Sequence, residues 1–307
     1  MGPEAVVAGR RAGMVEHRFR SMGCEVAVLA PSSRPDAEQL TQEVFARWDA
    51  RFSRFRPDSE LEGLNNAGGR PFRASAPMLT VLGAALRAAR ATDGLFDPLL
   101  GGRMAELGYD RTYEQLPAKR SASTLRDWRA GAWREIVVDA EHETVQLPLG
   151  YRVDLGGIAK GMAVDAAIEA MVIAGVPDVA VSAGGDLAVS GLPPGQESWM
   201  VAIEDTPAET VVAIRQGALA TSSVRRRRWV VNDAERHHLL DPRTGLPATG
   251  PIVQASVAAA TCGQAEVAAK MAILSDLPGA IGRLEQHRLA ALLVMSNGEA
   301  WRLGTWQ

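Results

Sequence analysis

The sequence predicts an α+β protein in which antiparallel sheets pack with helices. Short apolar segments separated by turn residues indicate hairpins and meanders, helical patterns lie between them, and no regular βαβ alternation indicates a parallel sheet. With 307 residues, the chain suits one large domain or two closely joined ones. No internal repeat, low-complexity segment or Pro-rich linker in the sequence marks a boundary.

The elements expected in the first half follow from the spacing of apolar residues and from glycines that can end a helix. Leu40, Val44 and Trp48 recur at helical spacing, and two later helical patterns end at Gly94 and Gly175. The predicted elements are a strand at 25–30, helices at 36–55, 76–92 and 158–174, a hairpin of residues 135–139 and 144–147, and a strand at 153–155 that enters a glycine pair.

Strands dominate the second half. The dipeptide Asn297-Gly298 is the strongest two-residue turn signal and predicts a final hairpin. Gly184-Gly185 indicates either a plain hairpin turn or a place where a ligand approaches the backbone closely. The predicted elements are strands at 179–182, 187–190, 199–204, 210–215, 227–231 and 252–260, and helices at 264–274 and 280–286.

Composition and charge exclude several classes of protein. The hydrophobic share of 47% and the charged share of 22% exclude a disordered or fibrous chain, and the net charge of −3 offers no field for nucleic acid. Cys24 and Cys262 form no disulfide framework, and residues 1–16 lack the apolar length of a signal peptide or membrane span. We therefore expect a cytoplasmic protein, without nucleic-acid or membrane partners, whose residues 1–16 are flexible.

The densest motif is the segment from Asp154 to Gly161. It turns on Gly156-Gly157 and opens a helix, so that backbone N–H groups and the helix dipole face outward together, and Lys160 adds a positive charge. Such a turn can receive phosphate, but it matches neither the Rossmann nor the P-loop pattern. The alternative is a simple glycine turn followed by an exposed lysine.

A second motif runs from His237 to Gly245. Histidine is the side chain best suited to accept a proton near neutral pH. Asp241 and Thr244 are typical of a turn in which these side chains cap their own backbone. The alternative to a catalytic role is that the segment only builds this turn.

Two other features have simpler explanations. The run Arg225–Arg228 could meet a phosphate or an acidic partner, but it more often marks a solvated strand edge. Cys24 could be a nucleophile, but no neighbouring base is visible in the sequence, and a buried, inert thiol is favoured.

These motifs occur in one order, and in that order the sequence resembles the ApbE-like flavin transferase family, the FAD:protein FMN transferases. The resemblance runs from about Phe19 to the last hairpin, and eight motifs in register make it specific. The matching segments are Met22-Gly23-Cys24, residues 53–61, Leu95-Phe96-Asp97-Pro98, Gly108-Tyr109-Asp110, residues 154–161, Gly184-Gly185-Asp186, Ala220-Thr221-Ser222 and residues 238–245.

The resemblance implies a T-fold-related α+β domain over residues 17–307, with two closely joined lobes and FAD in the cleft between them. Phe55 stands where Tyr or Trp is more usual, which keeps an aromatic face for a ring of FAD. Lys160 would lie near the pyrophosphate. The residues implied to contact FAD are Met22, Phe55, Leu95, Phe96, Asp97, Asp154, Lys160 and Leu240.

The implied reaction transfers FMN from FAD to a Thr or Ser hydroxyl of an acceptor flavoprotein and releases AMP, with His238 as the general base. The family's acceptor motif resembles Asp-x-x-Ser/Thr-Gly-Ala-Thr, which does not occur in this chain, so the acceptor would be another protein. Two alternatives stay open: an FAD-binding protein that has lost magnesium-dependent transferase chemistry, and an FAD hydrolase or repurposed flavin enzyme.

The family's Mg²⁺ site is where the sequence departs. Relatives use a helical Asp, a Thr four residues later and a backbone oxygen of the glycine loop. Here the resemblance assigns Glu266 and Gly157, while Lys270 replaces the Thr, and an ammonium cannot ligate a metal. Residues four apart share a helix face, so Glu266 and Lys270 can pair. Either the Lys270 ammonium stands in place of the metal, or Lys270 points to solvent and Mg²⁺ remains on Glu266 and the Gly157 carbonyl.

Overall fold

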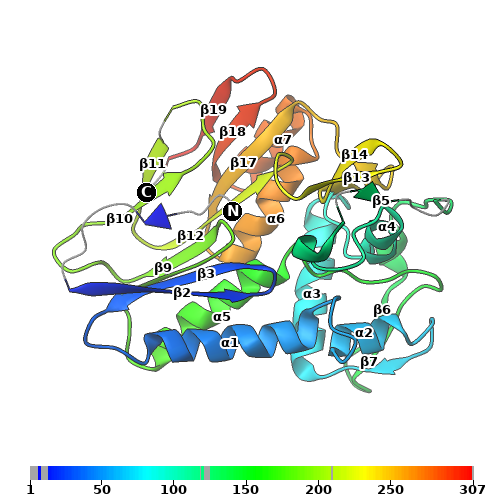
Figure 1. The fold of residues 1–307 in the computed structure, drawn as a ribbon, viewed down its shortest axis with the longest axis horizontal. Helices are drawn as coiled ribbons and strands as arrows, with labels where there is room; N and C mark the ends of the chain where they lie inside the picture. Colours follow the sequence, from blue (N-terminus) through cyan, green and yellow to red (C-terminus); the bar gives the residue numbers. More distant parts are fainter. Residues whose placement is uncertain (1–5, 8–12, 118, 121–124, 209, 306–307) are drawn as a thin grey trace. The chain divides into compact units, whose positions relative to one another are not determined.

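The computed structural model describes residues 6–7, 13–117, 119–120, 125–208 and 210–305. The chain divides into two compact units, each assembled from segments that are far apart in the sequence (Figure 1). Unit 1 comprises residues 1–47, 160–223 and 250–307, and unit 2 comprises residues 48–159 and 224–249. No local pattern in the sequence reveals this division, because it depends on contacts between distant segments.

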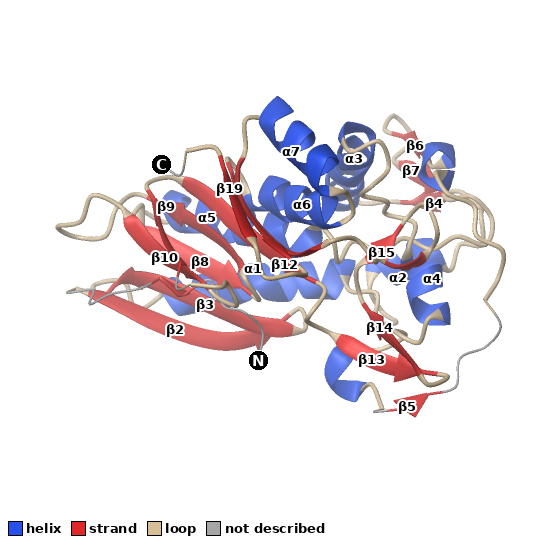
Figure 2. Cartoon of the chain, turned by 90° about the horizontal axis from the view of Figure 1, so that it is seen from above, coloured by secondary structure: helices blue, strands red, loops and turns tan. Residues whose placement is uncertain are grey.

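An antiparallel sheet of eight strands forms the centre of unit 1, in the order β19-β18-β17-β12-β9-β8-β3-β2 (Figure 2). Every neighbouring pair in it is antiparallel. The sheet therefore follows the predicted α+β class. Its strands are β2 (Met14–Ser21), β3 (Cys24–Pro31), β8 (Val179–Ala183), β9 (Asp186–Ser190), β12 (Gly217–Ser223), β17 (Ile252–Ala259), β18 (Ala290–Met295) and β19 (Ala300–Leu303).

Both faces of this sheet are covered, which explains why β8, β9 and β18 are buried along most of their length. On one face lies a three-stranded sheet of β1 (Val6–Val7), β10 (Trp199–Ile203) and β11 (Thr210–Ile214), with Trp199 in the shared apolar core. On the other face Figure 2 shows helices, and one of them packs against β12 and β17. The helices are α1 (Ala37–Phe52), α5 (Ala159–Ile173) and α6 (Cys262–Ile273); α7 (Leu277–Gln286) follows α6.

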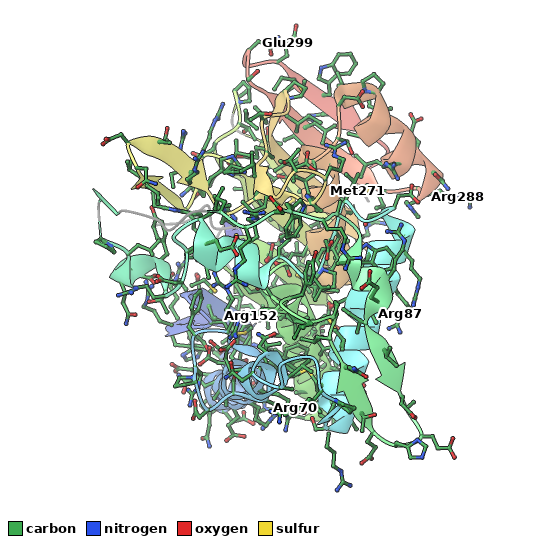
Figure 3. All side chains as sticks on the ribbon, turned by 90° about the vertical axis from the view of Figure 1, so that its right-hand side faces the viewer. Arg70, Arg87, Arg152, Met271, Arg288 and Glu299 are labelled. Carbon is green, nitrogen blue, oxygen red and sulfur yellow. The ribbon has the colours of Figure 1, made fainter. Side chains whose placement is uncertain are left out.

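Capping residues set the limits of these helices. Thr261 accepts the N–H of Gln264 at the start of α6, and Asp276 accepts the N–H of Gly279 at the start of α7. Helix α5 ends before Gly175, whose φ of 81° is the left-handed conformation that glycine adopts readily. In Figure 3 Met271, a buried residue of α6, lies among other side chains, whereas Glu299 lies at the periphery.

Unit 2 is built from short helices and short strands. Its core includes Tyr109, Trp229 and Leu240, and the indole N–H of Trp229 donates to the carbonyl oxygen of Leu107 at 2.8 Å. The elements are helices α2 (Glu60–Asn65), α3 (Ala76–Ala91) and α4 (Gly101–Glu106), the 3-10 turns Tyr113–Gln115 and Ala132–Glu135, the sheet β4 (Phe72–Arg73)-β7 (Thr144–Gln146)-β6 (Val137–Asp139), the sheet β14 (Ala234–His237)-β13 (Arg228–Val231)-β5 (Lys119–Arg120), and the hairpin β15 (Leu240–Asp241)-β16 (Leu246–Pro247).

Most predicted elements are present within a few residues of their expected limits, and three expectations need correction. The first helix ends at Phe52, so Phe55 lies in the turn that follows it. Residues 153–155 form no strand; only Arg152 bridges to Leu100. Strands β2 and β12 were not predicted, and β2 begins at Met14. An edge strand such as β2, with charged residues on one face, has little apolar signal.

Candidate functional site

Two hairpin turns meet at one end of the large sheet in unit 1. Met22-Gly23 joins β2 to β3, and Gly184-Gly185 joins β8 to β9; all four residues have positive φ, as a two-residue type I′ turn requires. A Cβ on Gly184 would lie 2.9 Å from the Cβ of Cys24, so the turns are in close contact. The glycine pair therefore forms a hairpin turn, and Cys24 is buried as expected.

The second of these turns delivers Asp186 to a cluster of four charged side chains. The Lys160 ammonium, in the first turn of α5, lies 2.5 Å from Asp186 Oδ2 and 2.6 Å from Glu266 Oε1. The Lys270 ammonium, one turn further along α6 than Glu266, lies 3.0 Å from the same Glu266 oxygen. We call these four residues the charge cluster. It brings together the glycine turn, the start of α5 and the middle of α6.

Burial and pairing control the charges of this cluster. The Glu266 side chain is 0% exposed and that of Asp186 4%, against 12% for Lys160 and 14% for Lys270. Burial alone would raise the pKa of Glu266, but the charges of both lysines and hydrogen bonds from Lys160 and the Gly161 N–H outweigh it and lower the pKa to about 2. Burial raises the pKa of Asp186, although Lys160 opposes that shift. The Lys160–Asp186 contact was not predicted, because 26 residues separate the partners.

These contacts test whether Glu266 could hold Mg²⁺. Its Oε1 accepts from both ammonium groups, and its Oε2 accepts the Gly161 N–H at 2.9 Å. A divalent cation at Glu266 would have to displace these donors and would face two positive charges. In the part of the chain that the structure describes, no group of three or more His, Cys, Asp or Glu side chains is arranged for a metal. The residues present therefore do not fit a divalent cation on Glu266.

Helices α5 and α6 cross at two glycines, which lets the charge cluster form. A Cβ on Gly161 would lie 2.6 Å from the Cys262 carbonyl oxygen and 2.8 Å from the Cα of Gly263. The Asp165 carboxylate accepts the N–H groups of Cys262 and Gly263 at 2.7 and 2.9 Å. The start of α6 is thus fixed to α5 by backbone contact and by a carboxylate cap.

Replacing Gly161 by Ala should therefore destabilise unit 1 strongly, by about 3 kcal/mol or more, because backbone atoms of α6 block the new methyl group. Urea unfolding of the purified variant measures the loss. Gly282→Ala on α7 is the matched control, since no atom lies within 4 Å of its added Cβ and the helix should gain stability. A Gly161→Ala protein as stable as the wild type would show that the helices do not cross this closely.

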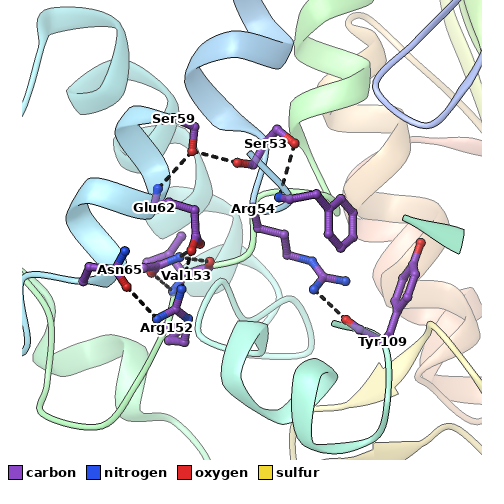
Figure 4. Close-up of polar contacts among 10 residues, drawn as sticks. Ser53, Arg54, Ser59, Glu62, Asn65, Tyr109, Arg152 and Val153 are labelled. Atoms are coloured by element: carbon purple, nitrogen blue, oxygen red, sulfur yellow. Dashed lines mark hydrogen bonds and ion pairs between the residues drawn. The ribbon is translucent and has the colours of Figure 1, made fainter. Parts of the chain in front are cut away.

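In unit 2, Arg54 contacts the first residue of the glycine motif, and Figure 4 shows its hydrogen bond to the Tyr109 backbone. Its Nε lies 3.0 Å from Asp154 Oδ2, and its Nη1 donates to the carbonyl oxygen of Tyr109 at 2.7 Å. The guanidinium also lies 4.1 Å from the centre of the Phe55 ring and 4.7 Å from that of Tyr109. The role of Arg54 was not predicted from the sequence, although a cation next to an aromatic residue in a matching motif favours a functional contact.

Asp154 shapes the turn that precedes α5. Its Oδ1 accepts the N–H of Gly156 at 2.7 Å, which is an Asx turn, and its side chain is 15% exposed. The backbone N–H of Asp154 donates to the carbonyl oxygen of Pro98 at 2.8 Å. Asp154 and the segment Leu95-Phe96-Asp97 are thus neighbours through Pro98 in unit 2.

Leu95, Phe96 and Asp97 lie in one buried turn after α3. The chain reverses at Gly94, whose φ is 80°, and the Thr92 hydroxyl accepts the Phe96 N–H at 3.0 Å. Asp97 Oδ1 accepts the Leu99 N–H at 2.8 Å. Burial raises the pKa of Asp97 to about 6, although the Leu99 N–H and the charge of Arg134 act in the opposite direction.

The raised pKa predicts a pH-dependent cost. An Asp whose folded pKa exceeds its usual value of 3.8 loses stability as pH rises from about 4 to 6, and the loss persists above pH 6. The stability of Asp97→Asn relative to the wild type should rise by about 2 kcal/mol between pH 4 and pH 7.5. Urea unfolding at both values measures it, with the exposed Asp127→Asn as control. A difference that does not change with pH would contradict this prediction.

The segment after β14 places the two neighbouring histidines differently. His237 Nε2 lies 3.0 Å from the Ala248 carbonyl oxygen, and burial lowers the His237 pKa. His238 is partly exposed, between β14 and β15. Leu240 packs in the unit 2 core, with Phe55 partly buried against the same cluster. The expected turn is confirmed: Asp241 Oδ1 accepts the Arg243 N–H, and the Thr244 hydroxyl accepts that of Leu246.

The structure thus gathers the expected residues into separate groups. Met22, Lys160 and Glu266 belong to unit 1, whereas Phe55, the Leu95–Asp97 segment, Asp154, Gly157, His238 and Leu240 belong to unit 2. Among the described residues, each helix is too short or too polar to cross a membrane. Arg228 is the one member of the arginine run that lies in β13, and it forms an ion pair with Glu235 of β14.

The fold and the site define an antiparallel α+β protein in which two carboxylates hold a lysine at a helix start. The sequence matches the ApbE family over residues 22–293. The chain therefore belongs to the ApbE family.

Individual relatives agree with this assignment. The FAD:protein FMN transferase of Treponema pallidum is 29% identical over 83% of this chain and 79% of its own length, and that of Salmonella typhimurium is 25% identical over 99% and 89%. The ApbE protein of Thermotoga maritima matches with a TM-score of 0.83 at 24% identity over 94% of this chain and 96% of its own. The flavin transferase ApbE of Vibrio cholerae gives 0.79 at 21%, over 94% and 96%. The two structures establish the shared fold.

Proposed function

We propose that this protein transfers FMN from FAD to a Thr or Ser hydroxyl of an acceptor protein and releases AMP. The observation that carries the proposal is the family match over residues 22–293, together with relatives named FAD:protein FMN transferase. The geometry supports it, because the positive end of α5 and the Lys160 ammonium suit a pyrophosphate.

The reaction is a displacement at phosphorus. The acceptor oxygen forms a bond to the phosphorus that carries riboflavin, and the bond from that phosphorus to the bridging oxygen breaks, so AMP leaves with the bridging oxygen. The hydroxyl proton passes to His238 and then to the released phosphate or to solvent. We prefer His238 to His237 as the base, because His237 is hydrogen bonded to the Ala248 carbonyl.

We propose FAD contacts at the positions that the family resemblance implies. Phe55 would offer an aromatic face beside Arg54, and Asp154 would hold the turn at the start of α5. The full set of proposed FAD contacts is Met22, Phe55, Leu95, Phe96, Asp97, Asp154, Lys160 and Leu240.

A second candidate function has one observation in its favour. Two lysine ammonium groups donate to the Glu266 carboxylate. This arrangement suits an FAD-binding protein without magnesium-dependent transfer, or an FAD hydrolase. In a hydrolase, water takes the place of the acceptor hydroxyl and the products are FMN and AMP.

Incubation of the protein with FAD and a non-fluorescent peptide that contains Asp-x-x-Ser/Thr-Gly-Ala-Thr separates these functions. A flavin-labelled peptide and equimolar AMP support transfer, AMP with free FMN indicates hydrolysis, and tight FAD retention without AMP indicates binding only. The same peptide with its hydroxyl residues changed to Ala is the control. We further propose an acceptor flavoprotein as partner and the cytoplasm as location, where the two thiols would stay reduced; cell fractionation tests the location.

A further inference from the structure

Lysine is rare in this protein, and two of its three lysines belong to the charge cluster. The sequence contains 33 basic residues, of which only Lys119, Lys160 and Lys270 are lysines, so arginine supplies the other 30. Arginine is thus the usual basic residue of this chain, but positions 160 and 270 have lysine, whose ammonium group is more compact. An ammonium fits between two carboxylate oxygens 2.5 and 2.6 Å away, whereas a planar guanidinium is larger and directional.

The carboxylates of the charge cluster are more deeply buried than its lysines. Glu266 and Asp186 are 0% and 4% exposed, and the two lysine side chains are more exposed than either. Lys270 does not extend into solvent, because its ammonium is bound to Glu266. An ammonium has three N–H donors, so its contact with Glu266 need not exhaust those of Lys270. The two carboxylates thus hold the ammonium groups in place through ion pairs.

The same contacts oppose a divalent cation at this place. Both Glu266 oxygens already accept hydrogen bonds, and each ammonium neutralises part of the charge that would attract a metal. Separating such a buried pair to admit a cation would leave charges without partners, which is costly. Helix α6 also offers no oxygen ligand at position 270.

We propose that Lys270 replaces the divalent cation, so that this protein binds the FAD pyrophosphate with the ammonium groups of Lys160 and Lys270 and transfers FMN without a metal. The inference rests on the proposed function. In the displacement, the ammonium groups would offset the negative charge that develops on the bridging oxygen, while Glu266 and Asp186 act as positioning residues. A fixed ammonium is a weaker electrophile than a divalent metal, so slow transfer is expected.

The first test measures metal binding without FAD, so it does not depend on activity. Titration with Mn²⁺, followed by electron paramagnetic resonance, should show no site of submillimolar affinity in the wild type. The Lys270→Thr substitution removes one of the groups bound to Glu266 and supplies a hydroxyl, so this variant should bind one Mn²⁺ ion. The double variant Lys270→Thr/Glu266→Gln should not bind it. Gln264→Thr, on an exposed position of α6, is the control and should bind no Mn²⁺.

The second test measures AMP release from FAD in the presence of the acceptor peptide, in EDTA and in Mg²⁺. We expect wild-type rates that agree within about twofold, and a Lys270→Thr rate at least about tenfold lower in EDTA than in Mg²⁺. A wild type that binds one Mn²⁺ through Glu266, or that loses AMP release in EDTA and recovers it with Mg²⁺, would overturn the proposal.

If the wild type releases no AMP in either buffer, the proposed transferase function fails and metal-free transfer with it. If AMP release is metal-independent, Lys270→Met should lower the rate of AMP release and weaken FAD binding in both buffers. A Lys270→Met variant with the wild-type rate and FAD affinity would also overturn the role of Lys270.

Discussion

Replacing His238 by Asn should slow FMN transfer by about 10²–10⁴-fold, the usual contribution of a general base. Asn keeps a polar side chain of similar size but cannot accept the hydroxyl proton of the acceptor. FAD affinity should change little, because the base acts on the acceptor and not on FAD. AMP release and peptide labelling measure the rate, and quenching of flavin fluorescence measures FAD binding.

The control for this prediction is His287→Asn, an exposed histidine at the end of α7 in unit 1. It should transfer FMN at the wild-type rate. His237→Asn tests whether His238 or His237 is the base. This variant should lose stability, because the contact with Ala248 is lost, but its transfer rate per folded molecule should stay close to that of the wild type. If His238→Asn kept a rate within threefold of the wild type, the base would have to be another group.

Local patterns in the sequence predicted the elements whose signals are local. The helix at 76–92 matches α3, because the apolar spacing lies within the segment and Gly94 follows two residues after it. The Glu266–Lys270 pair was expected for the same reason, since residues four apart on a helix are neighbours. The final hairpin that Asn297-Gly298 predicted is also present, with residues 296–299 between its strands.

Contacts between distant segments could not be predicted in this way. Lys160 reaches Glu266 across 106 residues of sequence, and Arg54 reaches Asp154 across 100 (154 − 54). In the sequence Lys160 looked like a solvent-exposed or ligand-binding group, whereas the fold gives it a buried ion partner. The family resemblance implied roles for Lys160, Asp154 and Glu266, but it did not reveal these partners.

Replacing Glu266 by Met should lower the free energy of unfolding by about 3–5 kcal/mol, the usual cost of removing one partner from a buried ion cluster. Met has a similar volume, so the loss reflects charge and not a cavity. The variant leaves two ammonium groups with Asp186 as the remaining carboxylate of the cluster. Lys270→Met should cost less, because Glu266 keeps the Lys160 ammonium and the Gly161 N–H. Urea unfolding of both variants measures these losses.

The double variant Glu266→Met/Lys270→Met separates stability from function. It removes one charge of each sign and leaves the Lys160–Asp186 pair, so it should be more stable than Glu266→Met alone by at least about 1 kcal/mol. If the double variant cost the sum of the two single losses, the two residues would not be energetically coupled. A double variant as stable as the wild type that no longer releases AMP would show that folding does not require this ion pair. Lys270 would then be present for the ligand, and Glu266 to hold Lys270 and Lys160 in place.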